Sequence, residues 1–230
     1  MTSRTILITG ANRGIGLTFT EIYAKQNWQV IACCRDLEQS IELRRLAKQL
    51  PNITLETLEI TNPKQIQNLA YKIMQPIDIL LLNAGIKGAS QTLSEINAED
   101  MLTVFDTNVV GQLSMIQYFA DKVTASYDKQ IVVLSSKMGS IDDNRSGGSY
   151  SYRASKAALN IVMKSVAIDL APQGVHVLIL HPGWVKTRMN GSDAPLDTFA
   201  SVSGMINIIN NYKNFKSGSF RDYKNQEIPW

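Results

Sequence analysis

The 230-residue sequence has few of the features that mark membrane, secreted or nucleic-acid-binding proteins. Its apolar runs are short, and the first, at Ile6–Ile8, is followed at once by Thr9 and Gly10. Such a run is too short for a signal peptide or a membrane span. The net charge is only +3 and no block of lysine and arginine occurs, so nucleic acid and acidic membranes are poor candidates as partners. We expect a cytoplasmic protein.

Cysteine and histidine are also scarce, with two of each. Cys33 and Cys34 are adjacent, and neighbours in a strand point to opposite faces, so a disulfide between them would need a distorted backbone. We therefore expect two buried free thiols. His176 and His181 lack a spacing typical of metal ligands, and no metal site is expected.

Short apolar runs alternate with longer amphipathic stretches along the whole chain. The runs lie at 5–9, 28–34, 53–60, 77–85, 130–136 and 175–183, and the stretches near 14–26, 37–50, 63–75, 98–126 and 150–171. Continuous apolar runs are typical of strands buried on both faces, and strand–helix alternation implies a parallel sheet covered by helices. Length alone would allow two small domains, but no linker or repeat is visible. The pattern predicts an α/β fold: one doubly wound Rossmann domain over 1–230.

Polar residues follow the predicted strands, where an open parallel sheet binds its ligands. They include Gly10, Arg35, Asn83, Ser136 and His181–Gly183. After the first strand, "TGANRGIG" places Gly10, Gly14 and Gly16 at the start of a helix. Glycines there allow a tight turn and let a phosphate approach the amides of a helix N-terminus. A simple tight turn is the alternative, but the position between strand and helix favours a dinucleotide site.

The end of the second strand bears on the choice of dinucleotide. NAD sites place a carboxylate there, whereas NADP sites place a cation near the ribose. Arg35 follows the strand, and Arg13 lies in the glycine turn. Asp36 has the spacing of an NAD-type carboxylate, but we interpret it as the N-cap of the next helix. Either arginine could be a solvated surface charge; together they favour NADP(H) over NAD(H).

Three further groups are candidates for chemistry. Asn108 interrupts an apolar helix stripe, so its buried amide is either a structural clamp or a group that faces a site. Ser135 and Ser136 end a strand, where alternation sends one hydroxyl into the crevice. Tyr152 and Lys156 are one helical turn apart, and an ammonium that stabilises a phenolate lowers the phenol's pKa toward neutrality. The sequence has no G-x-S-x-G motif of the kind serine hydrolases use.

The chain resembles the short-chain dehydrogenase/reductase family in six motifs that occur in order along its length. They are TGANRGIG, NAG at 83–85, Asn108, VVLSS, YRASK and PGWVKT at 182–187. The segment HPGWVKTRM and the ending SGSFRDYKNQEIPW are particularly similar to Sniffer-type carbonyl reductases and C-factor-like proteins. The resemblance implies an NADPH-dependent enzyme that reduces an aldehyde or ketone to an alcohol. A C-factor-like dinucleotide-binding signalling protein with little turnover is the alternative.

The resemblance also implies roles for residues. Tyr152 would be the acid/base, Lys156 would lower its pKa and hold the nicotinamide ribose, Ser136 would orient the carbonyl, and Asn108 would hold a water in a proton relay. The expected cofactor-binding residues, which include Tyr152 and Lys156, are otherwise Gly10, Asn12, Arg13, Gly14, Ile15, Gly16, Arg35, Glu59, Ile60, Asn83, Ala84, Gly85, Pro182, Gly183, Val185 and Thr187.

The sequence departs from the family pattern at three positions, none of them catalytic. Leu82 replaces a frequent asparagine, Glu59 stands where an aspartate usually meets the adenine, and Arg188 replaces a frequent acidic residue. The polar segments 137–151 and 184–197 are expected to shape the substrate pocket, the second as a lid. Small residues along the helix at 150–171, together with the family resemblance, lead us to expect a homodimer that acts on a small-molecule carbonyl substrate.

Overall fold

The structure, a computed structural model, describes residues 4–89 and 92–230. Its centre is a seven-stranded sheet with the order β3-β2-β1-β4-β5-β6-β7, in which all neighbouring strands are parallel. The strands are β1 (Thr5–Thr9), β2 (Gln29–Cys34), β3 (Ile53–Thr57), β4 (Ile79–Leu82), β5 (Gln130–Leu134), β6 (His176–His181) and β7 (Ser219–Asp222). The prediction of a doubly wound α/β fold is confirmed.

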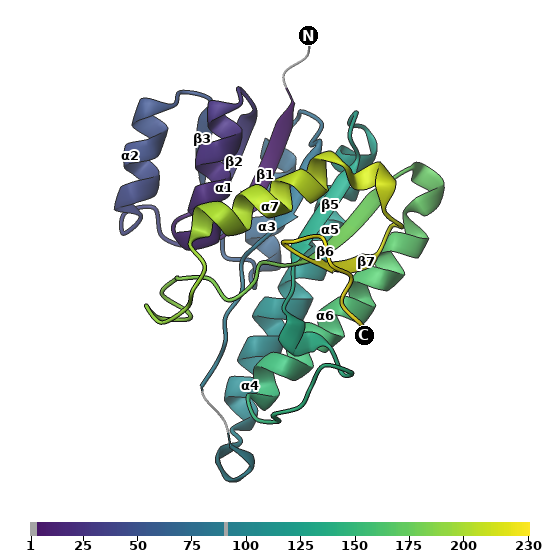
Figure 1. Ribbon diagram of the computed structural model, residues 1–230. Helices are drawn as coiled ribbons and strands as arrows, with labels where there is room; N and C mark the ends of the chain where they lie inside the picture. Colours follow the sequence, from purple (N-terminus) through teal and green to yellow (C-terminus); the bar gives the residue numbers. More distant parts are fainter. Residues whose placement is uncertain (1–3, 90–91) are drawn as a thin grey trace.

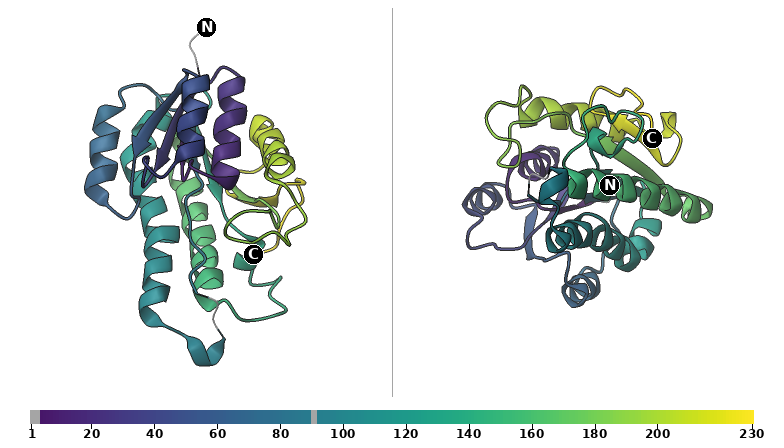
Figure 2. Two further views of the ribbon diagram at one scale, coloured as in Figure 1. Left: turned by 90° about the vertical axis from the view of Figure 1, so that its left-hand side faces the viewer. Right: turned by 90° about the horizontal axis from the view of Figure 1, so that it is seen from below.

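Helices cover both faces of this sheet (Figure 1). They are α1 (Gly14–Lys25), α2 (Ile41–Gln49), α3 (Pro63–Lys72), α4 (Ala98–Phe105), α5 (Gly111–Thr124), α6 (Tyr150–Asp169) and α7 (Thr198–Asn210). Short helical turns are η1 (Leu93–Glu95), η2 (Asp106–Val110), η3 (Lys137–Gly139), η4 (Ala171–Gln173) and η5 (Tyr212–Asn214). One apolar core joins the sheet to α1, α2 and α7, and a second joins it to α3, α5 and α6. The two views in Figure 2 show these two helical layers with the sheet between them.

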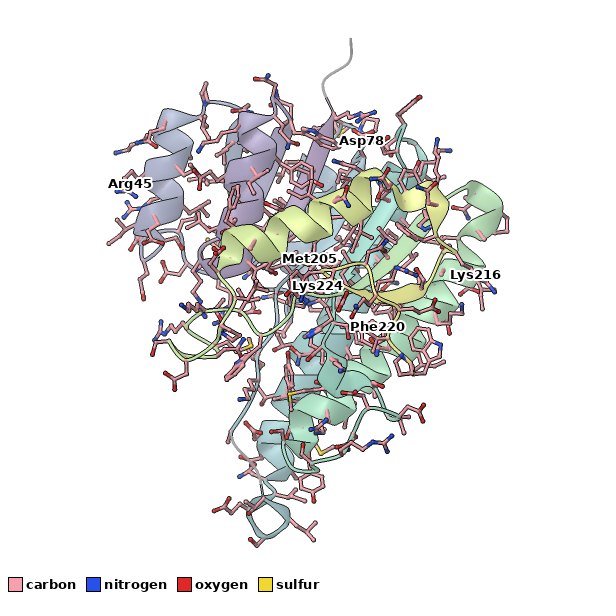
Figure 3. The ribbon with its side chains drawn as sticks, viewed as in Figure 1. Arg45, Asp78, Met205, Lys216, Phe220 and Lys224 are labelled. Atoms are coloured by element: carbon pink, nitrogen blue, oxygen red, sulfur yellow. The ribbon has the colours of Figure 1, made fainter. Side chains whose placement is uncertain are left out.

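The strand order places a topological switch between β1 and β4. The chain runs outward from β1 to β3, then returns past β1 to β4 and continues in the other direction. Open parallel sheets bind their ligands at such a point, in a crevice beyond the carboxyl ends of the strands, here β1 and β4. At the amino ends of the central strands, the carboxylate of Asp78 (labelled in Figure 3) accepts from the backbone amides of Thr5, Tyr127 and Asp128.

Several predicted elements differ from the observed ones. The amphipathic stretch at 37–50 forms a helix only from Ile41, because residues 36–40 form a turn. The stretch at 98–126 is α4 and α5 joined by the π-helical turn η2, which contains Asn108. The sequence analysis did not predict α7 or β7. Both cysteines are buried and free, as predicted.

Within the described ranges, no helix is long and apolar enough to cross a membrane. The same part of the chain contains no group of three or more His, Cys, Asp and Glu side chains that could hold a metal ion.

Candidate active site

The glycine turn between β1 and α1 leaves no room for larger residues. Gly10 and Gly14 have φ angles of +65° and +52°, a region that side-chain-bearing residues rarely adopt. A Cβ atom on Gly16 would lie 2.6 Å from Asn83 Nδ2 and would overlap the Gly10 carbonyl. Among the described residues, the N-cap Arg13 makes no side-chain hydrogen bond to the helix. The first amides of α1 are therefore available to an anion such as a phosphate. The other two residues predicted in this turn, Asn12 and Ile15, are partly buried beside it.

A hydrogen-bond network ties the glycine turn to the segment after β4. The buried hydroxyl of Thr9 accepts from the amides of Asn83 and Ala84 at 3.0 and 3.1 Å. Asn83 Nδ2 in turn donates to the carbonyls of Thr9 and Gly10 at 2.8 and 3.0 Å. The two strand ends on either side of the switch point are thus held at a fixed separation. Thr9 has this role although the sequence analysis did not single it out; a buried threonine directly before the glycines is the signal that was available.

Gly85 lies in the segment after β4, the cofactor-side segment 83–85, and is close to the predicted catalytic residues. A Cβ atom on Gly85 would lie 3.1 Å from Asn108 Oδ1 and 3.7 Å from Lys156 Nζ. Residues from the loop after β4, from η2 and from α6, far apart in the sequence, therefore meet at one point beyond the sheet.

Asn108 is fully buried and acts as a clamp. Its Nδ2 donates to the Ile86 carbonyl at 2.8 Å and to Ser155 Oγ at 3.0 Å, and its Oδ1 accepts from the Ile86 amide at 2.9 Å. The sequence left two roles open for Asn108, a structural clamp or a group that faces a site. These hydrogen bonds are those of a clamp, which fixes the backbone of Ile86. Both amide N–H groups are used in it, and the water-holding role implied by the resemblance stays a prediction. Gln112, one turn further on, donates to the Ala84 carbonyl and strengthens the same attachment.

The two serines after β5 point to opposite sides, as strand alternation predicts. Ser135 Oγ donates to Asn160 Oδ1 at 2.6 Å, away from the crevice. Ser136 Oγ accepts from the Met138 amide at 3.2 Å, and Ser136 lies near enough to the phenol of Tyr152 to oppose the rise of its pKa. Ser136 and Tyr152 therefore form a contact pair on the crevice side.

Lys156 is almost completely buried beneath this pair. Its Nζ donates to the Leu134 carbonyl at 2.8 Å and lies 5.9 Å from the centroid of the Tyr152 ring. Burial lowers the pKa of Lys156 to about 8. Because a buried ammonium is poorly solvated, this lysine loses its charge far more readily than one in water.

The expectation that Lys156 lowers the pKa of Tyr152 is wrong for this structure. Burial raises the pKa of Tyr152 above its ordinary value, and the hydrogen bond with Ser136 only opposes that rise. Desolvation of the buried phenol is the largest influence on this pKa. Tyr152 is consequently a protonated phenol, a group able to donate a proton.

At the adenosine end, Arg35 follows β2 and is largely exposed. One of its guanidinium nitrogens lies 3.6 Å from a carboxylate oxygen of Glu59, a distance that marks a loose ion pair rather than a hydrogen bond. The Ile60 carbonyl is covered by Gly111, where a Cβ atom would come within 2.7 Å. Arg13 is exposed on the glycine turn.

The interpretation of Asp36 as a helix N-cap is wrong. Its Oδ1 accepts from the Gln39 amide at 3.0 Å and so stabilises a turn, and the N-cap of α2 is Ser40. The turn takes the place of the first predicted helical residues because an aspartate side chain competes for nearby backbone amides.

The segment after β6 closes the crevice from the other side. Gly183 has a φ of +86°, and a Cβ atom there would meet Tyr223 and Leu196 within 3 Å. The Pro182 carbonyl accepts from Ser201 on α7 at 2.6 Å. Thr187 lies over the glycine turn, with its Cγ2 3.2 Å from where a Cβ on Gly14 would be. Val185 is fully buried and pairs with Leu196, so the predicted lid at 184–197 folds back on itself; its movement stays a prediction.

The switch-point crevice, the glycine turn and the Ser136–Tyr152–Lys156 group together define an α/β protein of the nucleotide-dependent oxidoreductase class. The comparison with known families agrees: the profile described as short chain dehydrogenase matches residues 4–196. The chain therefore belongs to the short-chain dehydrogenase/reductase family, as predicted.

Known relatives refine this placement. The chain is 39% identical over 155 residues to C-signal of Myxococcus xanthus, an alignment that covers 67% of this chain and 93% of that protein. It is 32% identical to the NADPH-bound carbonyl reductase from chicken fatty liver, with a TM-score of 0.92 and full coverage of both chains. The carbonyl reductase Sniffer of D. melanogaster is 33% identical with a TM-score of 0.91, over 99% of this chain and 100% of that one. Both similarities stated from the sequence are confirmed.

Proposed function

We propose that this protein is an NADP(H)-dependent oxidoreductase that reduces the carbonyl of an aldehyde or ketone to an alcohol, with Tyr152 as acid/base. The observation that carries the proposal is the Ser136–Tyr152 contact placed directly over buried Lys156, next to Gly85 of the cofactor-side segment. The carbonyl reductases among the structural neighbours support it.

The cofactor fits the residues that are present. Gly10, Gly14 and Gly16 keep side chains out of the turn, and the uncapped amides of α1 suit a pyrophosphate. Arg13 and Arg35 supply cations for a 2′-phosphate, which agrees with the NADP(H) bound to neighbouring structures. When bound, the reduced cofactor supplies the hydride that reaches the carbonyl carbon.

The chain's own residues handle the oxygen and the proton. Ser136 donates to the carbonyl oxygen and orients it toward Tyr152, and the Tyr152 phenol gives its proton to that oxygen as the negative charge develops. A raised phenol pKa suits this direction, because the acid is protonated before the reaction begins. Lys156 stabilises the phenolate that remains, and a pKa near 8 lets it return a proton.

The test of the reaction is Tyr152→Phe, which keeps the ring and removes the proton donor. We expect NADPH-dependent reduction of carbonyl compounds to fall by about 10²–10⁴-fold, while the dissociation constant for NADPH changes by less than threefold. Tyr150→Phe, two residues away and outside the contact pair, is the matched control. Equal turnover of Tyr152→Phe and the parent would refute the assignment.

The cofactor preference is tested separately by nicotinamide fluorescence titration at fixed salt. Arg13→Ala and Arg35→Ala should each weaken NADPH binding about tenfold and leave NADH binding unchanged, since only NADPH carries the 2′-phosphate. Arg45→Ala is the control, because Arg45 lies on α2 and points into solvent (Figure 3). Equal affinity of the parent for both cofactors would contradict the proposal.

The similarity to C-signal favours a second candidate, a dinucleotide-binding signalling protein with little turnover. One experiment distinguishes the two functions, because Tyr152→Phe should abolish reduction but leave a signalling output intact.

We also propose a homodimer formed through α5 and α6. Leu113 on α5, Ile161 and Ile168 on α6, and Val110 at the end of η2 are exposed apolar side chains. A group of exposed apolar side chains marks an interaction surface. Light scattering would show a mass of twice 25.5 kDa.

A further inference from the structure

The main-chain oxygen of Trp230 is bound by the turn that follows the catalytic serine. It accepts hydrogen bonds from the Ile141 amide at 2.6 Å, the Asp142 amide at 3.0 Å and the Ser140 hydroxyl at 3.1 Å. In Figure 1 the end of the chain lies beside α6 and the loop that precedes it. Three donors converging on one oxygen form an anchor stronger than a single surface hydrogen bond.

The tail that carries Trp230 is itself fixed to the sheet. Ile228 is buried, and its amide donates to the Phe220 carbonyl at 2.9 Å. The Trp230 ring stacks on Phe220 with centroids 5.8 Å apart and an interplanar angle of 23°. Phe220 belongs to β7 and is labelled in Figure 3. The anchor is therefore connected rigidly to the last strand rather than to a free end.

The anchored turn is linked to Ser136 by the short helix η3. The Gly139 amide donates to the Ser136 carbonyl at 2.8 Å, and the Ser140 amide donates to the Lys137 carbonyl at 3.0 Å. Gly139 also packs on the backbone of Lys156, where a Cβ atom would come within 2.7 Å. A shift of Ser140 must therefore move η3, and with it the serine that caps η3.

The other side of the same loop has a separate anchor. Arg153 donates to Ser146 Oγ at 2.9 Å and to the Gly147 carbonyl at 3.2 Å, and its contact with the Met138 carbonyl is longer, at 3.4 Å. Arg153 thus holds mainly the second half of the loop. The Ser140–Asp142 turn has local bonds, from the Asp143 amide to Ser140 Oγ at 3.1 Å and from the Asn144 amide to the Ile141 carbonyl at 3.2 Å. Trp230 joins this turn to the segment that follows β7.

We propose that Trp230 is a positioning residue: its main-chain oxygen fixes the Ser140–Asp142 turn and thereby holds the Ser136 hydroxyl on Tyr152. The inference rests on the proposed function, because that function assigns Ser136 and Tyr152 to the reaction. Loss of the anchor lets Ser136 move relative to the substrate oxygen, and misplacement of about 1 Å can reduce a rate about 10²-fold. Cofactor binding is not affected, since none of the residues that bind the cofactor contacts Trp230.

The experiment compares the parent with three variants. One lacks Trp230, and Trp230→Phe keeps the oxygen and a stacking ring. Ser140→Ala removes one donor to Trp230 together with the acceptor of the Asp143 amide. Ser165→Ala, exposed on α6, is the control for the serine change. The measurements are NADPH affinity, kcat and KM with benzaldehyde, the pH profile of kcat, and hydrogen exchange of residues 137–142. We expect removal of Trp230 to speed exchange, lower kcat tenfold or more, change KM and NADPH affinity less than threefold, and leave Trp230→Phe near the parent.

The pH profile of kcat distinguishes a positioning role from a merely structural one, because loss of a structural role alone would leave that profile unchanged. The hydrogen bond from Ser136 favours the phenolate of Tyr152, so loosening it raises the pKa of Tyr152 and moves the corresponding limb of the profile to higher pH. Two outcomes would overturn the inference. One is faster hydrogen exchange of residues 137–142 with kcat and the pH profile unchanged, and the other is unchanged hydrogen exchange. If the chain without Trp230 does not fold, Ser140→Ala decides by the same criteria, with a smaller expected loss of about threefold.

Failure of the proposed function would be visible independently. A parent that binds NADPH but shows no turnover refutes the reductase and not the anchor. In that case the phenols of each variant are titrated, and so are those of the same variant carrying Tyr152→Phe. The difference between the two titrations gives the pKa of Tyr152 and needs no turnover. An unchanged pKa after removal of Trp230 would then overturn the inference, and a raised pKa would support it.

Discussion

Lys156 should make the protein less stable at neutral pH than a neutral side chain of the same length would. It is almost completely buried, and its Nζ has one hydrogen bond, to the Leu134 carbonyl, among the interactions that the described residues make. The replacement Lys156→Met keeps an unbranched chain of similar volume and removes the charge. We expect Lys156→Met to be inactive and more stable than the parent.

The magnitude follows from the pKa of Lys156. Burial lowers that pKa from 10.5 to about 8, which at 1.36 kcal/mol per pKa unit corresponds to about 3 kcal/mol of destabilisation while the lysine is charged. The substitution also removes the hydrogen bond to Leu134, a loss of about 1 kcal/mol. The net gain in the free energy of unfolding is about 2 kcal/mol, or about 4–8 °C in Tm for a chain of this size.

The gain must depend on pH in a defined window. Below about pH 8 lysine is charged in both the folded and the unfolded chain, so the full penalty is present in the parent. Between pH 8 and 10.5 the unfolded chain binds more protons than the folded one, and the stability of the parent rises with pH. The advantage of Lys156→Met therefore shrinks through this window and disappears above it.

The assay is thermal unfolding followed by circular dichroism, at several pH values from 7 to 10.5, without cofactor. Lys164→Met, two turns further along α6 and less buried, is the matched control for replacing a lysine by methionine. A Lys156→Met variant that is less stable than the parent at pH 7, or whose gain does not change with pH, would refute the reasoning. Such a result would mean that the ammonium is better solvated than its burial indicates.

Three further predictions concern the same site. Asn108→Ala leaves the Ile86 amide and carbonyl without their partners and should lower the free energy of unfolding by about 2–4 kcal/mol in urea titrations; a loss below about 0.5 kcal/mol would show that the clamp is dispensable. Gly16→Ala should abolish NADPH binding in a fluorescence titration, whereas Gly147→Ala, with no atom within 4 Å of its Cβ, should keep it; retained binding in Gly16→Ala would contradict the tight turn. Because burial raises the pKa of Tyr152, ultraviolet titration should show its phenolate forming at higher pH than the phenolate of an exposed tyrosine, and a phenolate signal at neutral pH that Tyr152→Phe lacks would overturn that statement.

The central fold was predictable because its signals are local and repeated. Each of β1, β4 and β5 is a continuous apolar run buried on both faces, a pattern that few alternatives share. The last quarter of the chain was harder. In α7, serines and a glycine alternate with apolar residues, so no clear polar face marks it as amphipathic. β7 is only four residues long and has one fully buried side chain, Phe220, which no local pattern distinguishes from a loop.

The arrangement of the candidate site residues was predictable where their spacing along one helix or strand determines the direction of each side chain. Tyr152 and Lys156 are four residues apart on a helix, and alternation separates Ser136 from Ser135. Asp36 was misjudged because an aspartate after a strand can cap a helix or a turn, and the choice depends on where the following residues first become helical. The sequence holds no information on that point at single-residue resolution.

The pKa of Tyr152 shows a different kind of limit. Proximity of a cation to a phenol in sequence predicts a lowered pKa, and that argument treats the two groups as if both were in water. Burial affects both groups: it raises the pKa of the phenol and lowers the pKa of Lys156. Since burial comes from the packing of β5, α6 and η3 together, the sign of the result depends on tertiary structure. The structure therefore places a protonated phenol beside a lysine that loses its charge more readily than one in water.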